Sequence, residues 1–261
     1  MIADEKPISM FRLFRNLILA AGFVLLTGFT QLNQTANINI FARPLPFIPT
    51  SFFNLSNGIN DFSITMANKY EDWKLANQHI SKELFSYAVK GYQYLAAKNI
   101  LHNTNIITIA DLSKPSSQKR LFVINIKTGE VLFSTLVAHG KNSGQEYAKN
   151  FSNSESSFES SLGFYTTTDT YIGKHGYSLR LNGCEKGFND KANKRAIVVH
   201  GAEYVSESFI RQNGFLGRSH GCPAVPVELS KKIIDVIKNG SCLFVYSPSK
   251  KYLTHSAILN N

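Results

Sequence analysis

Short apolar segments separated by turn residues make up most of the chain after residue 104, and they constrain the fold more than any other feature. They are typical of strands and lie at residues 106–109, 121–126, 131–137, 164–168, 177–181, 196–199 and 243–246. The clearest hairpin spans residues 120–133, where Gly129 suits a tight reversal. We therefore predict a mainly β domain, of the sandwich or barrel type, with flanking helices.

Helical periodicity appears at three places. After Ser81, apolar residues recur every three or four positions as far as residue 96, and Ser81 itself suits the N-cap. Shorter helices are predicted over residues 203–212 and 228–238, the second one stopped by Gly240. Residues 151–161 contain six serines and are predicted to be a loop.

Residues 1–36 have the pattern of an export signal. Three basic residues, Lys6, Arg12 and Arg15, precede an apolar run of 13 residues at positions 17–29. That run is shorter than the roughly 20 residues that a membrane-spanning helix needs, which favours a cleaved signal peptide over a retained N-terminal anchor. We expect an irregular tether over residues 37–80, a folded domain over residues 81–250, and a location in the periplasm or cell envelope.

The chain is basic, with 28 Lys and Arg against 18 Asp and Glu, a net charge of +10. Such a charge suits an anionic partner. For an exported protein the abundant anionic partners are envelope polymers and lipids. No basic helix or aromatic stacking motif accompanies the charge, so nucleic acid is not expected as a partner. Contact with the membrane is expected only through the N-terminal segment.

Three cysteines in an exported chain leave at least one thiol unpaired within the chain. Cys242 lies in an apolar run and is predicted to be buried and inert, and Cys184 follows a turn signal. Cys222 stands between Gly221 and Pro223, outside any regular element, and is the candidate reactive thiol. The alternative is a structural disulfide from Cys222 to one of the other two cysteines.

Two histidines are candidates for activating Cys222. A thiol with a pKa near ~8.5 is mostly protonated at neutral pH, so a nucleophilic cysteine needs a neighbouring base or cation. His220 is two residues away but constrained by the turn, whereas His200 ends an apolar strand that can aim its side chain. We favour His200. The spacing of these three residues does not match a zinc site, so neither a metal nor another cofactor is predicted.

The segments that carry these residues resemble a known family. The His-Gly pair at residues 200–201 and the string Gly-Arg-Ser-His-Gly-Cys-Pro at residues 217–223 are similar to the signature of the L,D-transpeptidase catalytic domain (YkuD type). Residues 136–144 and 173–178 look like an exported, murein-remodelling branch of that family. The likeness covers roughly residues 105–247.

The resemblance implies cysteine acyl transfer on peptidoglycan stem peptides. Cys222 would be the nucleophile and His200 its base, oriented by the carbonyl of Gly201 or a near neighbour. The N–H groups of Gly221 and Cys222 would stabilise the oxyanion, so that substituting Gly221 should harm rate more than stability. Substrate contacts are expected from Arg218, Ser219, His220 and Tyr204.

The implied reaction cleaves the bond between diaminopimelate and D-alanine and transfers the acyl group to an amine. The sequence does not identify the acceptor, for which the candidates are another stem peptide, a lipoprotein lysine and water. Acylation of Cys222 by carbapenems is implied as well. Competing hypotheses are a catalytically silent peptidoglycan-binding module, an L,D-carboxypeptidase and another thiol hydrolase using the same site.

Two departures from the family pattern are visible. The 18 residues between His200 and Ser219 slightly exceed the usual gap, which predicts a longer loop over the site. Many relatives place Arg or Asn two positions after the cysteine, where this chain has Ala224, and Arg218 is the candidate replacement. His139 and His175, each followed by glycine, either line the groove or are satisfied by backbone groups; neither is predicted to be catalytic.

Overall fold

The computed structural model describes residues 68–261. The predicted export signal and residues 37–67 of the predicted tether lie outside this range. Within it, no helix is both long enough and apolar enough to cross a bilayer.

The strands of the described residues form one mixed, eight-stranded sheet in the order β3-β2-β1-β8-β4-β5-β6-β7. Their bounds are β1 (Ile106–Asp111), β2 (Leu121–Asn125), β3 (Val131–Thr135), β4 (Gly163–Gly173), β5 (Gly176–Gly183), β6 (Val198–Gly201), β7 (Ala224–Val225) and β8 (Cys242–Tyr246). β1 is parallel to β8 and β6 is parallel to β7, whereas the other neighbouring strands are antiparallel. The prediction of a mainly β fold is confirmed.

The sheet curves until its two edges almost meet. The segment that follows β3 makes isolated bridges to the other end of the sheet, from Ala138 to Ala224 and from Gly140 to Ser219. Near closure of this kind leaves fewer unpaired backbone groups at the edges. It also brings the loop after β3 against residues 219–224, which contain the candidate nucleophile.

The flanking helices are also confirmed. They are α2 (Lys82–Ala97), α3 (Glu207–Asn213), α4 (Val227–Ile237) and α5 (Lys250–His255), with short 3-10 helices η2 (Leu75–Gln78) and η3 (Lys141–Ser143). The Ser81 side chain accepts a hydrogen bond from the Leu84 amide at 3.1 Å, as predicted for an N-cap.

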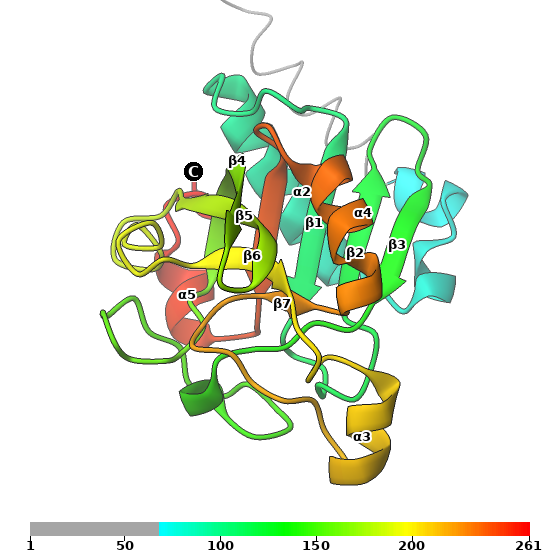
Figure 1. The fold of residues 1–261 in the computed structure, drawn as a ribbon. Coiled ribbons are helices and arrows are strands. Elements are labelled where there is room, and N and C mark those ends of the chain that lie inside the picture. Colours follow the sequence, from blue (N-terminus) through cyan, green and yellow to red (C-terminus); the bar gives the residue numbers. More distant parts are fainter. Residues whose placement is uncertain (1–67) are drawn as a thin grey trace, which may run out of the picture. The chain divides into compact units, whose positions relative to one another are not determined.

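Two of the helices cover opposite faces of the sheet, α2 behind β1 and α4 in front of it in Figure 1. Gly91 of α2 lies against the Phe164 ring of β4, so closely that a Cβ on Gly91 would lie 2.0 Å from that ring. Thr167, three residues further along β4, donates from its hydroxyl to the Ile237 carbonyl of α4. Side chains alternate between the faces of a strand, which places these two contacts on opposite sides.

The ends of the described region pack into the core. Residues 68–80, expected to be irregular, contain η2 and bury Tyr70, Leu75 and Ile80. At the other end Tyr252 of α5 and Ile258 are buried in the same hydrophobic cluster.

Some boundaries differ from those predicted, each for a local reason. The strand predicted from residue 196 begins at Val198, because Ala196 has φ +52° and its neighbour Ile197 bonds back to Ala192. The helix predicted from residue 203 begins at Glu207, because Ser206 caps it by accepting from the Phe209 amide. The strand β7 and the helix α5 were not predicted, since both are short.

Candidate active site

The candidate base, His200, lies on β6 with its side chain almost fully buried. Its Nδ1 atom lies 2.9 Å from the carbonyl oxygen of Gly201, so Nδ1 carries the proton and Nε2 is left as an acceptor. Burial lowers the pKa of His200, partly offset by this hydrogen bond, and nearby His175 and Lys174 lower it further. The imidazole is therefore neutral at neutral pH, as a base must be.

The candidate nucleophile, Cys222, ends a turn that Ser219 holds together. The Ser219 hydroxyl donates to the Cys222 carbonyl at 2.7 Å and accepts from the Gly221 amide at 3.0 Å. Gly221 has φ +117°, and a Cβ at this position would lie 2.7 Å from the Glu159 carbonyl oxygen. Only glycine fits this turn without strain.

This turn changes the expected oxyanion site. The Gly221 amide donates to Ser219, so it is not free to stabilise an oxyanion, contrary to the expectation from the resemblance. The Cys222 amide makes no hydrogen bond within the described range, which leaves it available. The close approach of Glu159 also means that substituting Gly221 should cost stability as well as rate.

Strand pairing brings the turn beside the base. β7 is parallel to β6 with His200 opposite Ala224 and Gly201 opposite Val225. Cys222 precedes Ala224 by two residues, and the nearby backbone of Val198 on β6 lowers the pKa of its thiol. Lys174 acts electrostatically on both Cys222 and His200. The two side chains therefore share one neighbourhood.

All three cysteines are free, and the disulfide alternative is not realised. The Cys222 thiol donates to the Ala196 carbonyl over 3.7 Å, and no hydrogen bond joins it to His200 in the part of the chain that the structure describes. Burial raises the pKa of the Cys222 thiol, partly offset by the Val198 backbone and the Arg195 and Lys174 charges. The thiol is therefore neutral at neutral pH.

The residues expected to contact substrate fall into two groups. Ser219 is buried with its hydroxyl used inside the turn, so its role is structural and the expected substrate contact does not fit. His220 is exposed and packs on the Phe158 ring with centroids 4.5 Å apart. Arg218 is also exposed and donates to the Gly144 carbonyl at 3.3 Å, which leaves the guanidinium accessible from solvent.

Tyr204, the fourth of these residues, lies in the turn before α3 rather than in the helix. It covers Gly217, where a Cβ would lie 2.4 Å from the tyrosine Cβ, and it packs against a small cluster that includes Val205 and Leu216. Burial and the nearby Cys222 raise the pKa of Tyr204 to about 12. The side chain is half-buried at the edge of the site.

A buried arginine that sequence reasoning missed supports the loop after β3. Arg120 donates from Nε and Nη2 to the Val137 carbonyl and from Nη2 to His139 Nδ1, all within 3.0 Å. His139 Nε2 lies 3.2 Å from the Gly144 carbonyl, and burial lowers the pKa of His139 to about 4. Of the two alternatives expected for His139, lining the groove or bonding to backbone groups, the structure shows the second. The His139 carbonyl in turn accepts a hydrogen bond from the Ser219 amide.

A second arginine, Arg195, was also missed because no motif marks it. It donates to the carbonyls of Ser152 and Glu159 at 2.9 and 2.7 Å and to the hydroxyls of Ser157 and Ser161. These bonds fix the serine-rich loop (residues 151–161) next to the turn that ends in Cys222 (residues 219–222, the nucleophile turn). Its charge favours the thiolate form of Cys222.

The turn between β4 and β5 supplies the remaining neighbours. His175 is exposed and stacks on the His200 ring, with centroids 4.3 Å apart and planes inclined by 22°. The sequence left His175 either lining the groove or satisfied by backbone groups, and its stacking on the His200 ring was not predicted.

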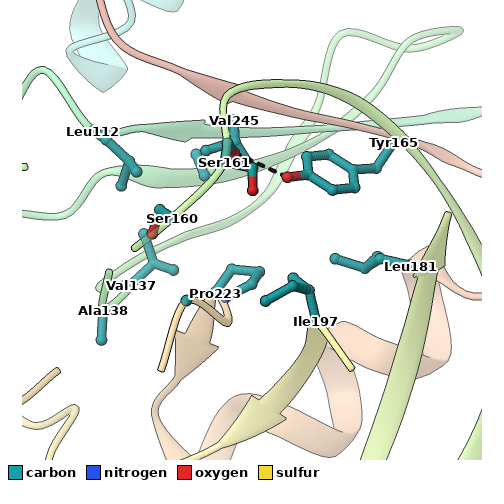
Figure 2. A pocket seen from close by; sticks show the side chains of 12 residues that line it. Leu112, Val137, Ala138, Ser160, Ser161, Tyr165, Leu181, Ile197, Pro223 and Val245 are labelled. Carbon is teal, nitrogen blue, oxygen red and sulfur yellow. Dashed lines mark hydrogen bonds between the residues drawn. The ribbon is translucent and has the colours of Figure 1, made fainter. Parts of the chain in front are cut away.

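The nucleophile turn packs against apolar side chains in the interior. A small cavity beneath it is lined by Gly221 and Pro223 from the turn and by Tyr165, Leu181 and Ile197 from the surrounding elements (Figure 2). Figure 2 shows Pro223 and Ile197 pointing towards this cavity, on whose far side the Tyr165 hydroxyl donates to the Ser161 carbonyl. Pro223 therefore helps to close an interior space.

Within residues 68–261, no group of three or more His, Cys, Asp or Glu side chains is arranged to hold a metal ion.

Solved structures that resemble this chain at low identity include L,D-transpeptidases. The enzyme from Mycobacterium smegmatis is 16% identical, with a TM-score of 0.35, over 55% of this chain and 59% of its own. The enzyme from Stackebrandtia nassauensis is 16% identical, with a TM-score of 0.34, over 64% and 68%. Pgp2, a helical cell shape determining protein from Campylobacter jejuni, is 15% identical, with a TM-score of 0.37, over 61% and 54%.

The chain thus spans 59% of the Mycobacterium smegmatis enzyme, less than two thirds of its length. A comparison with curated proteins gave no match. The model of the L,D-transpeptidase catalytic domain family matches residues 76–246, which is most of the described region and includes both His200 and Cys222. The chain belongs to the L,D-transpeptidase catalytic domain family.

Proposed function

We propose that this protein is an L,D-transpeptidase that uses Cys222 to transfer acyl groups between peptidoglycan peptides outside the cytoplasm. The observation that carries the proposal is the parallel pairing of β6 and β7, which sets the turn of Cys222 beside the strand of His200. The orientation of the base by Gly201 supports the same assignment. Membership of the family supports the substrate class.

In the first step, His200 Nε2 takes the proton of the Cys222 thiol as the sulfur attacks the carbonyl carbon between diaminopimelate and D-alanine. The carbon–nitrogen bond then breaks, and D-alanine leaves with the proton held by His200. An acyl-enzyme thioester remains on Cys222. The thiol and imidazole are both neutral beforehand, so proton transfer accompanies attack instead of preceding it.

The Cys222 amide is the backbone donor proposed for the oxyanion, since its neighbour's amide is occupied by Ser219. A donor of this kind is typically worth about 3 kcal/mol in the transition state. The hydrogen bond from the thiol to Ala196 has to give way to one with His200 when substrate is bound. Contacts between catalytic groups are often long in the absence of substrate and tighten in the complex.

In the second step, an amine attacks the thioester, and His200 takes the proton of the amine and returns it to the departing sulfur. An amine on a second stem peptide gives a cross-link, a lipoprotein lysine gives anchoring, and water gives carboxypeptidase activity. Two exposed basic side chains close to the site, Arg218 beside Ser219 and Lys174, which acts on Cys222, suit a substrate that carries carboxylates.

The test is to incubate the purified protein with tetrapeptide muropeptides and to measure free D-alanine and the mass of the products. We expect D-alanine release by the wild type and by Cys184→Ala, and none by Cys222→Ala. Cys184 is the matched control because it is also partly exposed but lies after β5, outside the turn. Incubation with imipenem should give a covalent adduct on the wild type and on Cys184→Ala, lost only in Cys222→Ala.

The same assay separates the competing functions. Binding of muropeptides with no release of D-alanine would contradict the proposal and identify a catalytically silent binding module. Release of D-alanine with no cross-linked or lysine-linked product identifies water as the acceptor. Release from peptides unrelated to the wall, but not from muropeptides, would identify a different thiol hydrolase.

A further inference from the structure

The tip of the β4–β5 hairpin carries a second imidazole to the candidate base. Gly173 and Gly176 pair across the tip, and Gly176 has φ +73°, a left-handed glycine directly after the turn residues Lys174 and His175. The register of β4 against β5 shifts between Thr167 and Thr170, and a bulge of this kind bends a strand. Beyond the bulge, Ser178 of β5 pairs with His200 of β6, so the hairpin tip is anchored directly to the strand of the base.

Contact between the two rings is close and nearly parallel. Their centroids lie 4.3 Å apart with an angle of 22° between the planes. Among residues 68–261 the His200 ring makes a single hydrogen bond, from Nδ1 to the Gly201 carbonyl, and one bond leaves the ring free to tilt about it. The stacked His175 ring blocks that tilt from one side and shields the face of the imidazole from water.

We propose that His175 is a positioning residue for the base: its ring, stacked on His200, holds the imidazole in the plane from which Nε2 reaches the sulfur of Cys222. The inference rests on the proposed function, in which His200 is the base. His175 acts through His200 and does not itself touch the reacting atoms. Position 175 therefore requires a flat side chain but does not require the ring nitrogens of histidine.

The charged groups around the pair predict how the stack responds to pH. His175 faces Lys174 on its own turn, His200 on β6 and His220 on the nucleophile turn. His200 faces His175 and Lys174. None of these neighbours is acidic, and two imidazolium rings at this separation repel each other. Protonation of His175 therefore keeps His200 neutral to lower pH than His200 would be alone.

Three variants separate the ring from its charge. His175→Phe keeps a flat ring without a charge, and His175→Ala removes the stack. His255→Phe is the control, because this exposed histidine lies on α5, outside the active site. His175 is exposed as well, so none of the three changes should lower the melting temperature by more than about 2 °C.

We expect His175→Ala to lower kcat for D-alanine release about tenfold with KM within twofold, because transition-state geometry is lost while substrate binding is kept. His175→Phe should retain kcat within threefold and move the acid limb of the pH–rate profile to higher pH. His255→Phe should match the wild type in both respects. Equal kcat and equal acid limbs in wild type and His175→Ala would overturn the inference, as would an equal loss in the Phe and Ala variants.

A measurement that needs no turnover keeps this result distinct from a failure of the proposed function. Titration of the His200 imidazole resonances by NMR should show a higher midpoint in His175→Phe than in the wild type, and an unchanged midpoint in His255→Phe. If the wild type neither releases D-alanine nor reacts with imipenem, the proposed function fails. If it does both, and neither the kcat of His175→Ala nor the His200 midpoint of His175→Phe differs from the wild type, the inference about His175 fails alone.

Discussion

The Nδ1 atom of His200 lies 2.9 Å from the carbonyl oxygen of Gly201, the next residue on the same strand. This contact decides which ring nitrogen is free, because a carbonyl oxygen can only accept. Nε2 is then the atom that meets the thiol proton. Burial keeps the imidazole neutral by lowering its pKa and keeps the thiol neutral by raising its pKa.

The first prediction concerns the pH dependence of acylation of Cys222 by imipenem. A neutral base loses its function as it is protonated, so the rate should fall only below the lowered pKa of His200, with a midpoint under 6.5, the ordinary pKa of histidine. Above that midpoint the rate should be level through neutral pH. His200→Gln should lose this limb and slow acylation by about 10²–10⁴-fold. Stopped-flow or intact-mass kinetics between pH 4 and 9 measures it.

A wild-type rate that climbs tenfold for each pH unit up to pH 9 would contradict this prediction. That profile belongs to a thiol that reacts only through its own small thiolate fraction. The control is iodoacetamide labelling of urea-unfolded protein. There the three thiols have lost their folded surroundings, and each reacts according to its own thiolate fraction.

The second prediction compares two glycines with positive φ. Gly221→Ala places a Cβ 2.7 Å from the Glu159 carbonyl and adds backbone strain, which alone costs roughly 1–3 kcal/mol. Gly214 has φ +81° and nothing within 4 Å of an added Cβ, so Gly214→Ala costs only the left-handed conformation, about 1–2 kcal/mol. Urea unfolding should show the greater loss for Gly221→Ala, and only this variant should lose reaction with imipenem. Equal behaviour of the two variants would contradict the tight turn.

The third prediction concerns Arg195. Replacing it by Met removes the charge that stabilises the thiolate and the bonds that hold the serine-rich loop. The pKa of Cys222 should rise further, so alkylation by iodoacetamide at pH 8 should slow by more than threefold. Arg218→Met is the matched control, because Arg218 is exposed and does not contribute to the pKa of Cys222. If both variants react like the wild type, the charge of Arg195 has no influence on the thiol.

Much of the fold follows from local pattern. The strands β1, β2 and β8 and the helix α2 lie within one or two residues of the predicted bounds, because each combines a simple periodicity with a cap or a turn residue. The strand β7 is only two residues long and owes its existence to its neighbours β6 and Ala138. A segment so short has no periodicity to detect.

The candidate site also has residues that the sequence predicts and residues that only the fold brings into place. The Cys222 and His200 pair stands out because both residue types are chemically distinctive and glycine follows or precedes them. The hydrogen bond that occupies the Gly221 amide depends on the direction of the Ser219 side chain, which a sequence does not carry. Arg120, Arg195 and His175 reach the site across sequence separations of tens of residues, so only the closed sheet brings them there.

The last prediction concerns Glu185, a buried carboxylate that fastens the C-terminal helix. It accepts hydrogen bonds from the Phe164 amide and the Tyr252 hydroxyl, both at 2.8 Å, and from Ser256. Burial raises its pKa, and these donors pull the pKa back down. A pKa that is higher in the folded than in the unfolded protein means that stability is greatest below the unfolded value and is lost as pH rises through the folded value.

Tyr252→Phe removes one donor and raises the folded pKa of Glu185 further, which extends that loss. We expect the variant to be less stable than the wild type by about 1–3 kcal/mol at pH 8 and by clearly less at pH 4.5, where the carboxyl is closer to neutral in both. Tyr147→Phe, at a tyrosine that is 44% exposed, should change neither value. Urea unfolding at the two pH values measures the difference. A deficit of the same size at both would mean that Tyr252 stabilises α5 by packing alone, independently of the charge on Glu185.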